Sequence, residues 1–174
     1  MIERIISGGQ NGVDQAAIRA ARAVGIATGG WAPRGWMTLD GPAPWLADYG
    51  LLEHAAPGYP SRTEANVRDS DATLRIAVDF ESAGERCTLR MIDRHKKPRA
   101  DVLLAVDRIY GGYRVAGGVV DGARRVADAR AFEILIAWVK RYRIINIAGN
   151  SERTAPRISA PAEGLLRSLF MEAR

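Results

Sequence analysis

The chain has 174 residues, of which 47% are hydrophobic and 26% charged, values typical of a folded globular protein rather than a disordered one. Its single cysteine, Cys87, excludes an internal disulfide, and no uninterrupted apolar stretch approaches the length of a membrane span. The two histidines, His54 and His95, lie far apart without ligand-like spacing, which argues against a metal site. The length predicts one domain over residues 1–174. The single cysteine fits a reducing compartment and the start, M-I-E-R, has no signal-peptide pattern, so we expect a cytoplasmic location.

The net charge of +5 and the isoelectric point near 9.8 favour anionic partners. Basic clusters at residues 94–97 and 140–143 lie where we expect helix C-termini, and cations there complement the helix dipole. The sequence contains no nucleic-acid-binding motif with interleaved aromatic residues, so it does not favour nucleic acid as a partner. The excess charge can equally serve a small polyanion.

In chain order, the first predicted elements are a strand over residues 3–7 and a helix over residues 13–24. The turn between them contains Gly8, Gly9 and Gly12. Glycines let a backbone turn tightly and approach a ligand with no Cβ in the way. The amides of the first helical turn have no partner within the helix, and they point at the ligand with the positive end of the helix dipole behind them. This order predicts an anion-binding turn.

A glycine turn that only joins a strand to a helix is the alternative interpretation. A plain connection needs no polar side chains, whereas this one also carries Ser7, Gln10, Asn11 and Asp14. Because a carboxylate repels a bound phosphate, Asp14 either caps the helix, orients Arg62 or accepts hydrogen bonds from the ligand. We expect valine in place of Gly9 to fill the space of the ligand and to leave the fold intact.

Residues 26–60 are rich in glycine and proline and are predicted to be irregular, with one short strand near residues 26–30. Irregular segments of this length in a compact domain are usually functional. Three of the four tryptophans, Trp31, Trp36 and Trp45, fall here. They either anchor the segment on the core or stack on a flat heterocycle.

Strands and helices alternate in the remainder of the chain. A capping box at Ser61 and Glu64 predicts a helix that runs to residue 69. We further predict strands over residues 72–78, 102–106 and 144–148, helices over residues 86–95, 121–140 and 162–171, a turn at residues 82–84, and irregular segments at residues 109–119 and 149–161. The alternation implies a Rossmann-like, doubly wound α/β fold with a mostly parallel sheet and helices on both faces.

In such a fold, ligands bind at the carboxyl ends of the strands, where the loops meet. Besides residues 7–14, these loops include residues 29–35, 62–71 and 149–153, and Thr88 follows a second helix start. Arg34 is a bidentate donor suited to phosphate. The alternatives are a surface ion pair for Arg62, a solvated cation for Arg153 and a turn pair for residues 70–71.

The sequence has no pattern typical of nucleophilic catalysis. There is no Ser-His-Asp set, no nucleophilic context for Cys87 and no G-x-S-x-G motif, and paired carboxylates for acid–base chemistry do not stand out. The candidate residues are donors and glycines, which favours a binding site over a catalytic one. We expect no catalytic cofactor.

Six motifs occur in order along nearly the whole chain. They are S-G-G-Q-N-G-V-D (7–14), G-G-W-A-P-R-G (29–35), D-G (40–41), R-T-E-A-N-V (62–67), S-D-A-T (70–73) and I-N-I-A-G (145–149). Together they resemble the molybdenum carrier (molybdenum cofactor carrier protein) family. That family is one of the Rossmann-like nucleotide-ligand binders, a group that includes the Lonely Guy phosphoribohydrolases.

The resemblance implies a non-catalytic protein that binds and protects molybdenum cofactor and stores or delivers it. This cargo is a phosphorylated pyranopterin dithiolene with an oxomolybdenum group. The resemblance also implies a homo-oligomer, either a tetramer or a dimer, with a molybdoenzyme apo-protein or cofactor biosynthesis proteins as further partners. The family motifs place the cofactor-binding residues at Gly8, Gly9, Gln10, Gly12, Asp14, Gly30, Pro33, Gly35, Arg62, Thr63, Asn66, Asp71 and Thr88. The loops add Ser7, Asn11, Arg34, Gly84, Gly149, Asn150, Ser151 and Arg153.

The chain departs from the family pattern at two places, which leaves the exact ligand open. Where such proteins often have A-G-P-R-E-S, this chain has A-G-N-S-E-R (148–153), and residues 85–87 are substituted within the segment 82–88. The competing interpretations are a nucleotide-processing N-glycosidase of the Lonely Guy type and a nucleotide-ligand sensor. Those hydrolases use a P-G-G-x-G-T-x-x-E turn, but residues 82–90 have no double glycine, and Leu89, Arg90 and Met91 stand where the glutamate is needed.

Overall fold

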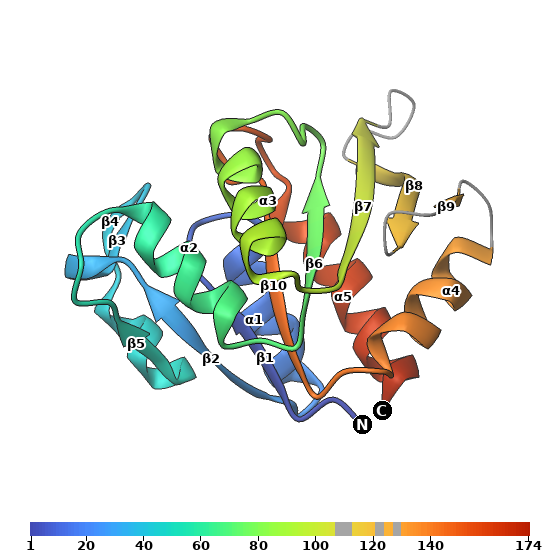
Figure 1. Cartoon of the computed structure of the whole chain (residues 1–174), viewed down its shortest axis with the longest axis horizontal. Helices are drawn as coiled ribbons and strands as arrows, with labels where there is room; N and C mark the ends of the chain where they lie inside the picture. The colour runs from blue at the N-terminus through green and yellow to red at the C-terminus, as the bar shows by residue number, and fades with distance from the viewer. Residues whose placement is uncertain (107–112, 121–123, 127–129) are drawn as a thin grey trace.

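The computed structural model describes residues 1–106, 113–120, 124–126 and 130–174 (Figure 1). Within these residues, eight strands form one sheet in the order β5-β2-β1-β10-β6-β7-β8-β9, and β3 and β4 form a separate two-stranded hairpin. The first six strands in that order run parallel, whereas β8 and β9 run antiparallel to their neighbours. The predicted Rossmann-like α/β fold with a mostly parallel sheet is confirmed.

The centre of the sheet consists of β1 (Arg4–Ser7), β10 (Ile144–Gly149) and β6 (Ala72–Ala77), all three predicted from the sequence. They are runs of mainly apolar residues, as expected for parallel strands covered on both faces. The register pairs Ile5 with Ile145. Because the three strands are parallel, the loops that follow them leave the sheet at the same edge.

The other side of the sheet differs from the prediction. It consists of β7 (Arg99–Val106), β8 (Tyr113–Val120) and β9 (Arg124–Val126), followed by α4 (Arg130–Val139). The irregular structure predicted for residues 113–119 and the helix predicted for residues 124–126 are wrong, because main-chain pairing with β7 and β8 overrides the weak strand propensity of the glycines. The parts of these predictions at residues 109–112, 121–123 and 127–129 lie outside the described residues.

Helices cover both faces of the sheet (Figure 1). One layer contains α1 (Val13–Ala23), α4 and α5 (Ser159–Ala173), and the other contains α2 (Tyr59–Arg68) and α3 (Ala83–His95). Fully buried alanines on α1 let this helix approach the sheet and α5 closely: Ala16, Ala17, Ala20 and Ala21. No helix among the described residues is long and apolar enough to cross a membrane.

The segment 26–60 has more regular structure than its glycines and prolines suggest. It contains β2 (Ala27–Ala32), η1 (Arg34–Trp36), β3 (Met37–Thr38), β4 (Gly41–Pro42), η2 (Pro44–Tyr49) and β5 (Leu51–Glu53). Trp36 packs against a small core cluster around Leu46 and Leu51. Trp31 instead donates a hydrogen bond from Nε1 to Asp69, and Trp45 is 45% exposed, so only Trp36 anchors the segment on a core cluster.

Three helices start two or three residues earlier than predicted. Ser61 is not an N-cap, because α2 begins at Tyr59 after Gly58, and Glu64 pairs instead with Arg94 and His95 of α3. Proline is tolerated in the first turn of a helix, where no amide is needed, so Pro60 and Pro161 fall inside α2 and α5. In α3, Ser82 is the N-cap, and its Oγ accepts a hydrogen bond from the amide of Glu85 at 3.4 Å.

Candidate ligand-binding cleft

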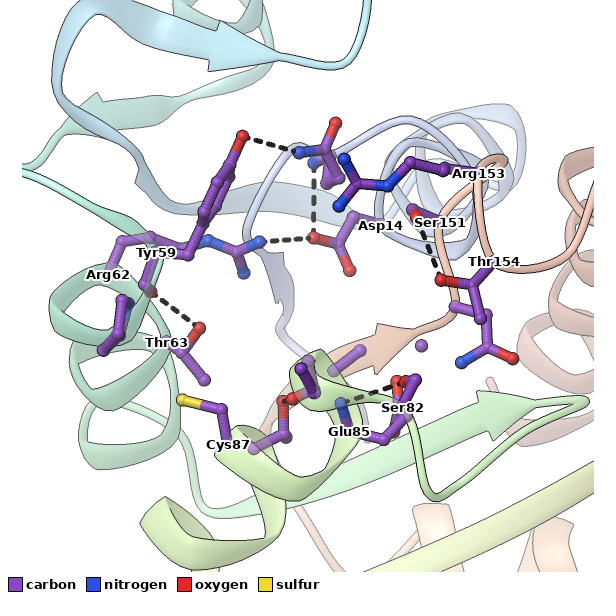
Figure 2. A pocket seen from close by; sticks show the side chains of 18 of the residues that line it. Asp14, Tyr59, Arg62, Thr63, Ser82, Glu85, Cys87, Ser151, Arg153 and Thr154 are labelled. Carbon is purple, nitrogen blue, oxygen red and sulfur yellow. Dashed lines mark hydrogen bonds and ion pairs between the residues drawn. The ribbon is translucent and has the colours of Figure 1, made fainter.

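A cleft of about 460 Å³ opens beside the carboxyl ends of β1 and β10 and the starts of α2 and α3 (Figure 2). Five separate segments of the chain line it, and four of them are loops or helix starts at this edge of the sheet, as the topology predicts; the fifth contributes Leu39. Ten of the predicted site residues are among the lining residues: Gln10, Asp14, Arg62, Thr63, Gly84, Thr88, Gly149, Asn150, Ser151 and Arg153.

A buried ion pair between Asp14 and Arg62 forms one wall of the cleft. Arg62 Nη2 lies 3.3 Å from Asp14 Oδ2, and the two side chains are 12% and 5% exposed. The guanidinium lies directly over Gly8, where an added Cβ would approach Nη1 to 1.7 Å. Burial raises the pKa of Asp14 above its usual range, although Arg62 and the amide of Gln10 act in the opposite direction. The absence of a Cβ at Gly8 therefore makes room for the guanidinium, which would have to move if a side chain were added.

The amides of the glycine-rich turn are largely occupied by the protein itself. Gln10 N donates to the Asp14 carboxylate at 3.2 Å, Asn11 N donates to Gln10 Oε1 at 2.9 Å, and Val13 N donates to the Asn150 carbonyl at 3.2 Å. The predicted anion-binding turn is thus corrected: Asp14 supplies the negative charge that the start of α1 attracts. Its position in the first helical turn explains this role.

Backbone amides at the start of α3 remain available to donate hydrogen bonds into the cleft. Among the residues that the structure describes, the amides of Ala83 and Gly84 have no hydrogen-bond acceptor. An added Cβ on Gly84 would meet no atom within 4 Å. Thr88 Oγ1 donates to the Gly84 carbonyl at 3.1 Å, which leaves its own lone pairs available. The second predicted helix start, and not the first, presents open amides to the cleft.

Residues after β10 form the opposite wall. Arg153 is exposed, points across the cleft toward Asp14 and forms no ion pair within the described part of the chain (Figure 2). Asn150 has a structural role, because its Oδ1 accepts hydrogen bonds from the amides of Val78 and Asp79, both at 2.9 Å. Ser151 Oγ lies 3.5 Å from Thr154 Oγ1.

The other predicted residues of the glycine-rich turn shape the loop and do not line the cleft. Ser7 is fully buried and donates a hydrogen bond to the Asp14 carbonyl at 3.0 Å. An added Cβ on Gly9 would meet Leu46 at 2.7 Å, so the expectation that valine there fills ligand space is wrong. An added Cβ on Gly12 would lie 2.5 Å from the Asn150 carbonyl oxygen, and Asn11 Oδ1 accepts a hydrogen bond from Leu39 N.

Two further predicted residues join α2 to β2. Asn66 is 1% exposed, and its side chain accepts from Trp31 N at 2.8 Å and donates to Trp31 O at 3.0 Å. Gly30 lies against this amide and against β1, where an added Cβ would come within 2.3 Å of the Ser7 carbonyl oxygen. Pro33, Arg34 and Gly35 do not line the cleft, because the loop after β2 turns toward β5, where Gly35 N donates to Glu53.

Asp71 lies at the opposite edge of the sheet. Its carboxylate accepts hydrogen bonds from the amides of Arg143 and Ile144 at 2.9 and 2.8 Å, at the amino end of β10. Asp71 precedes β6 and so lies at the amino ends of the parallel strands, whereas the cleft lies at their carboxyl ends. Its predicted place in the ligand site is therefore corrected to a structural role.

The sequence prediction missed Glu85, which lines the cleft although its side chain is almost fully buried. Its Oε2 lies 3.6 Å from Arg75 Nη1 and has no hydrogen-bond partner within the described residues. Arg75 is already bound by both carboxylate oxygens of Asp101, at 2.8 and 2.6 Å. Burial, only partly offset by Arg75, raises the pKa of Glu85 to about 8. Ser82 and Glu85 match the capping-box spacing, a signal for this helix start.

The charge state of Glu85 predicts a pH dependence of folding stability. The pKa of Glu85 is about 8 in the folded protein against an ordinary value of 4.5, so between these values the folded state keeps a proton that the unfolded state loses. This contribution to stability is complete below the ordinary value and declines as the pH rises toward 8. Glu85→Gln, which cannot ionise, is expected to become progressively more stable than wild type over that interval. Urea denaturation at several pH values measures the difference, and parallel curves would mean that Glu85 is ionised in the folded protein.

Comparison with known proteins assigns the family. The model of the circularly permutated YpsA SLOG family matches residues 5–170. The chain belongs to this family. A crystal structure of the "putative molybdenum carrier protein" from Syntrophus aciditrophicus SB is similar to this SLOG-family chain with 30% identity and a TM-score of 0.73, covering 98% of this chain and 95% of the other. No match was found among curated proteins.

An imine reductase from Myxococcus stipitatus in complex with NADP⁺ is also similar to this SLOG-family chain, with 13% identity and a TM-score of 0.39 over 97% of this chain and 61% of the other. A similarity this low carries no argument about function.

Proposed function

We propose that this protein binds the phosphorylated pterin of molybdenum cofactor in the cleft and carries it as cargo without chemical turnover. The proposal depends mainly on the donors without acceptors that line one cavity, namely the amides of Ala83 and Gly84 and the guanidinium of Arg153. A phosphate group has enough acceptor oxygens to satisfy such a set. The volume, about 460 Å³, lies in the usual range of small-molecule sites. The similarity to a protein named as a molybdenum carrier supports a pterin as the remainder of the ligand.

Arginines complete the electrostatics of the proposed site. Figure 2 shows Arg62 and Arg153 on opposite sides of the cleft, with the start of α3 below them. The charge of Arg62 is already balanced by Asp14, whereas Arg153 makes no ion pair with any described residue. Arg153 and Arg90, an exposed lining arginine that also has no ion pair with any described residue, therefore supply the net positive charge for an anionic ligand. Arg62 supplies further N–H groups held in place by its partner.

One observation favours a second candidate function, an N-glycosidase acting on nucleotides. The carboxyl groups of Asp14 and Glu85 both belong to residues that line the cleft, and burial raises the pKa of each above its usual range. Carboxyl groups with raised pKa values can act as general acids near neutral pH. This candidate requires the release of free base from a nucleoside monophosphate.

The two candidates are separated by one loading experiment. We expect the purified protein, incubated anaerobically with molybdenum cofactor and desalted, to retain about one pterin and one molybdenum per chain. The fluorescence of the oxidised pterin after denaturation and metal analysis measure both. Incubation with nucleoside monophosphates should leave them intact. Failure to retain cofactor, together with release of free base, would reverse the order of the two candidates.

The variant Arg153→Ala tests, in the same experiment, whether Arg153 contacts the ligand. Because Arg153 is exposed and forms no ion pair in the described structure, the variant should fold with wild-type stability. Loss of one charge-assisted contact should weaken ligand binding by about 1.5 kcal/mol or more, which is at least roughly tenfold. Wild-type retention by this variant would remove Arg153 from the proposed site.

A further inference from the structure

Glu85 occupies a buried position where its ion-pair partner among the described residues, Arg75, also binds a second acid. It lines the cleft, its side chain is 2% exposed, and its Oε2 has no hydrogen-bond partner among the described residues. The cation beside it, Arg75, forms two short hydrogen bonds to Asp101. Asp101 and Glu85 share the guanidinium of Arg75, the better geometry belongs to Asp101, and Asp101 is also approached by Arg99 Nε at 3.5 Å. An ionised Glu85 would therefore place a poorly paired negative charge under the start of α3.

The charged groups that surround Glu85 also disfavour its ionised form. They are Arg75 on β6, Asp101 on β7, Asp14 on α1 and Asp79 in the loop after β6, so three of the four are acids. Arg62, Arg90 and Arg153 are the arginines among the residues that line the cleft. Arg62 is paired with Asp14. The immediate surroundings of Glu85 therefore favour its neutral form.

We infer that Glu85 is a ligand-recognition residue that stays protonated when the cleft takes up a phosphorylated ligand and donates its hydrogen bond to that ligand, so that binding is coupled to one proton. This inference rests on the proposed function, because it requires an anionic ligand in the cleft. The free amides of Ala83 and Gly84 place the phosphate beside the same helical turn that carries Glu85. A carboxylic acid there offers a donor, whereas a carboxylate there repels the phosphate.

The coupling has a defined sign. An anion in the cleft stabilises the protonated form of Glu85, and by reciprocity the protonated protein binds the anion more tightly. Because the pKa of Glu85 is about 8, affinity is nearly constant at neutral pH and falls above that value. One linked proton gives a loss of about tenfold between about pH 7 and about pH 9.

The test compares wild type, Glu85→Gln and Glu81→Gln with 6-hydroxymethylpterin phosphate as the probe. Dissociation constants are measured by calorimetry from about pH 7 to about pH 9. Glutamine keeps an N–H donor at position 85 and cannot ionise, whereas Glu81 is an exposed carboxylate near the same helix start that does not line the cleft. Titration of the probe itself affects all three proteins equally, so the difference between the curves belongs to Glu85.

We expect wild type and Glu81→Gln to lose about tenfold more affinity over this range than Glu85→Gln. Coincident curves for wild type and Glu85→Gln would overturn the inference and leave the proposed function standing. Absence of binding by all three proteins at every pH would overturn both. If Glu85→Gln does not fold, the number of protons that wild type takes up on binding the probe decides, measured by calorimetry in two buffers. We expect this uptake to rise through about pH 8 by more than the titration of the probe accounts for. Absence of the additional uptake would overturn the inference.

Discussion

Alanine in place of Arg62 is expected to weaken ligand binding and to destabilise the fold at the same time. The guanidinium forms a buried ion pair with Asp14 and lies over the backbone of Gly8. Its removal leaves a buried carboxyl group without its cation, which destabilises proteins by about 3–5 kcal/mol. The same change removes charged donors from the cleft, and we expect binding to weaken by about 1.5–3 kcal/mol, roughly ten- to hundredfold. Urea denaturation and calorimetry measure the two effects separately.

A second substitution separates the two roles of Arg62. Asp14→Asn keeps a side-chain oxygen for the amide of Gln10 but carries no charge, so Arg62→Ala combined with Asp14→Asn should recover much of the lost stability. Ligand affinity should stay low in the double variant. The stability loss of Arg62→Ala should also shrink at acid pH, because the pKa of Asp14 is already raised and rises further without Arg62. Wild-type affinity in a folded Arg62→Ala variant would restrict this residue to a structural role.

Alanine in place of Gly30 should strongly destabilise the fold, although Gly30 does not line the cleft. Gly30 has a φ of 119°, and an added Cβ would lie 2.3 Å from the Ser7 carbonyl oxygen and 2.7 Å from the Ser7 amide. Both atoms belong to the main chain of β1, so the neighbouring strand must move. We expect a loss of about 3–5 kcal/mol in the free energy of unfolding, measured by urea denaturation.

The matched control is Gly84→Ala, at a glycine in the first turn of α3 where an added Cβ would meet nothing within 4 Å. This variant should keep the wild-type free energy of unfolding within about 1 kcal/mol. If Gly30→Ala unfolds at the wild-type urea concentration, β2 is not held against β1 as the structure describes.

The sequence was sufficient to predict elements whose signal is local. The apolar runs of β1 and β10 and the loops that follow them identify the edge of the sheet where the cleft lies. The same reasoning failed for β8, because pairing with β7 is a long-range effect that glycines in the strand conceal. Asp71 was wrongly placed in the ligand site, although the sequence already showed that it precedes the strand β6 and therefore lies at the other edge of the sheet.

The chemistry of the cleft was harder to predict than its location. Arg62 and Asp14 were both candidates, but their mutual pairing, which occupies the start of α1, depends on the approach of α2. Glu85 was missed because its surroundings depend on Arg75, which pairs with it, and on Asp101, which pairs with Arg75, and these residues lie on two other strands. A capping pattern can locate the start of a helix, but it cannot tell whether the acid in that pattern faces solvent or a neighbouring strand.

The position of β10 also determines when during synthesis the sheet can close. This strand comes after all the others in chain order, yet it lies between β1 and β6. Until the ribosome has released residues 144–149, the segments β5-β2-β1 and β6-β7-β8-β9 have no strand to join them, and each keeps an unpaired inner edge. From the synthesis of β7 until β10 emerges, the nascent chain therefore carries two incomplete half-sheets. Chaperone protection in that interval should matter more than for a fold in which successive strands pair in chain order.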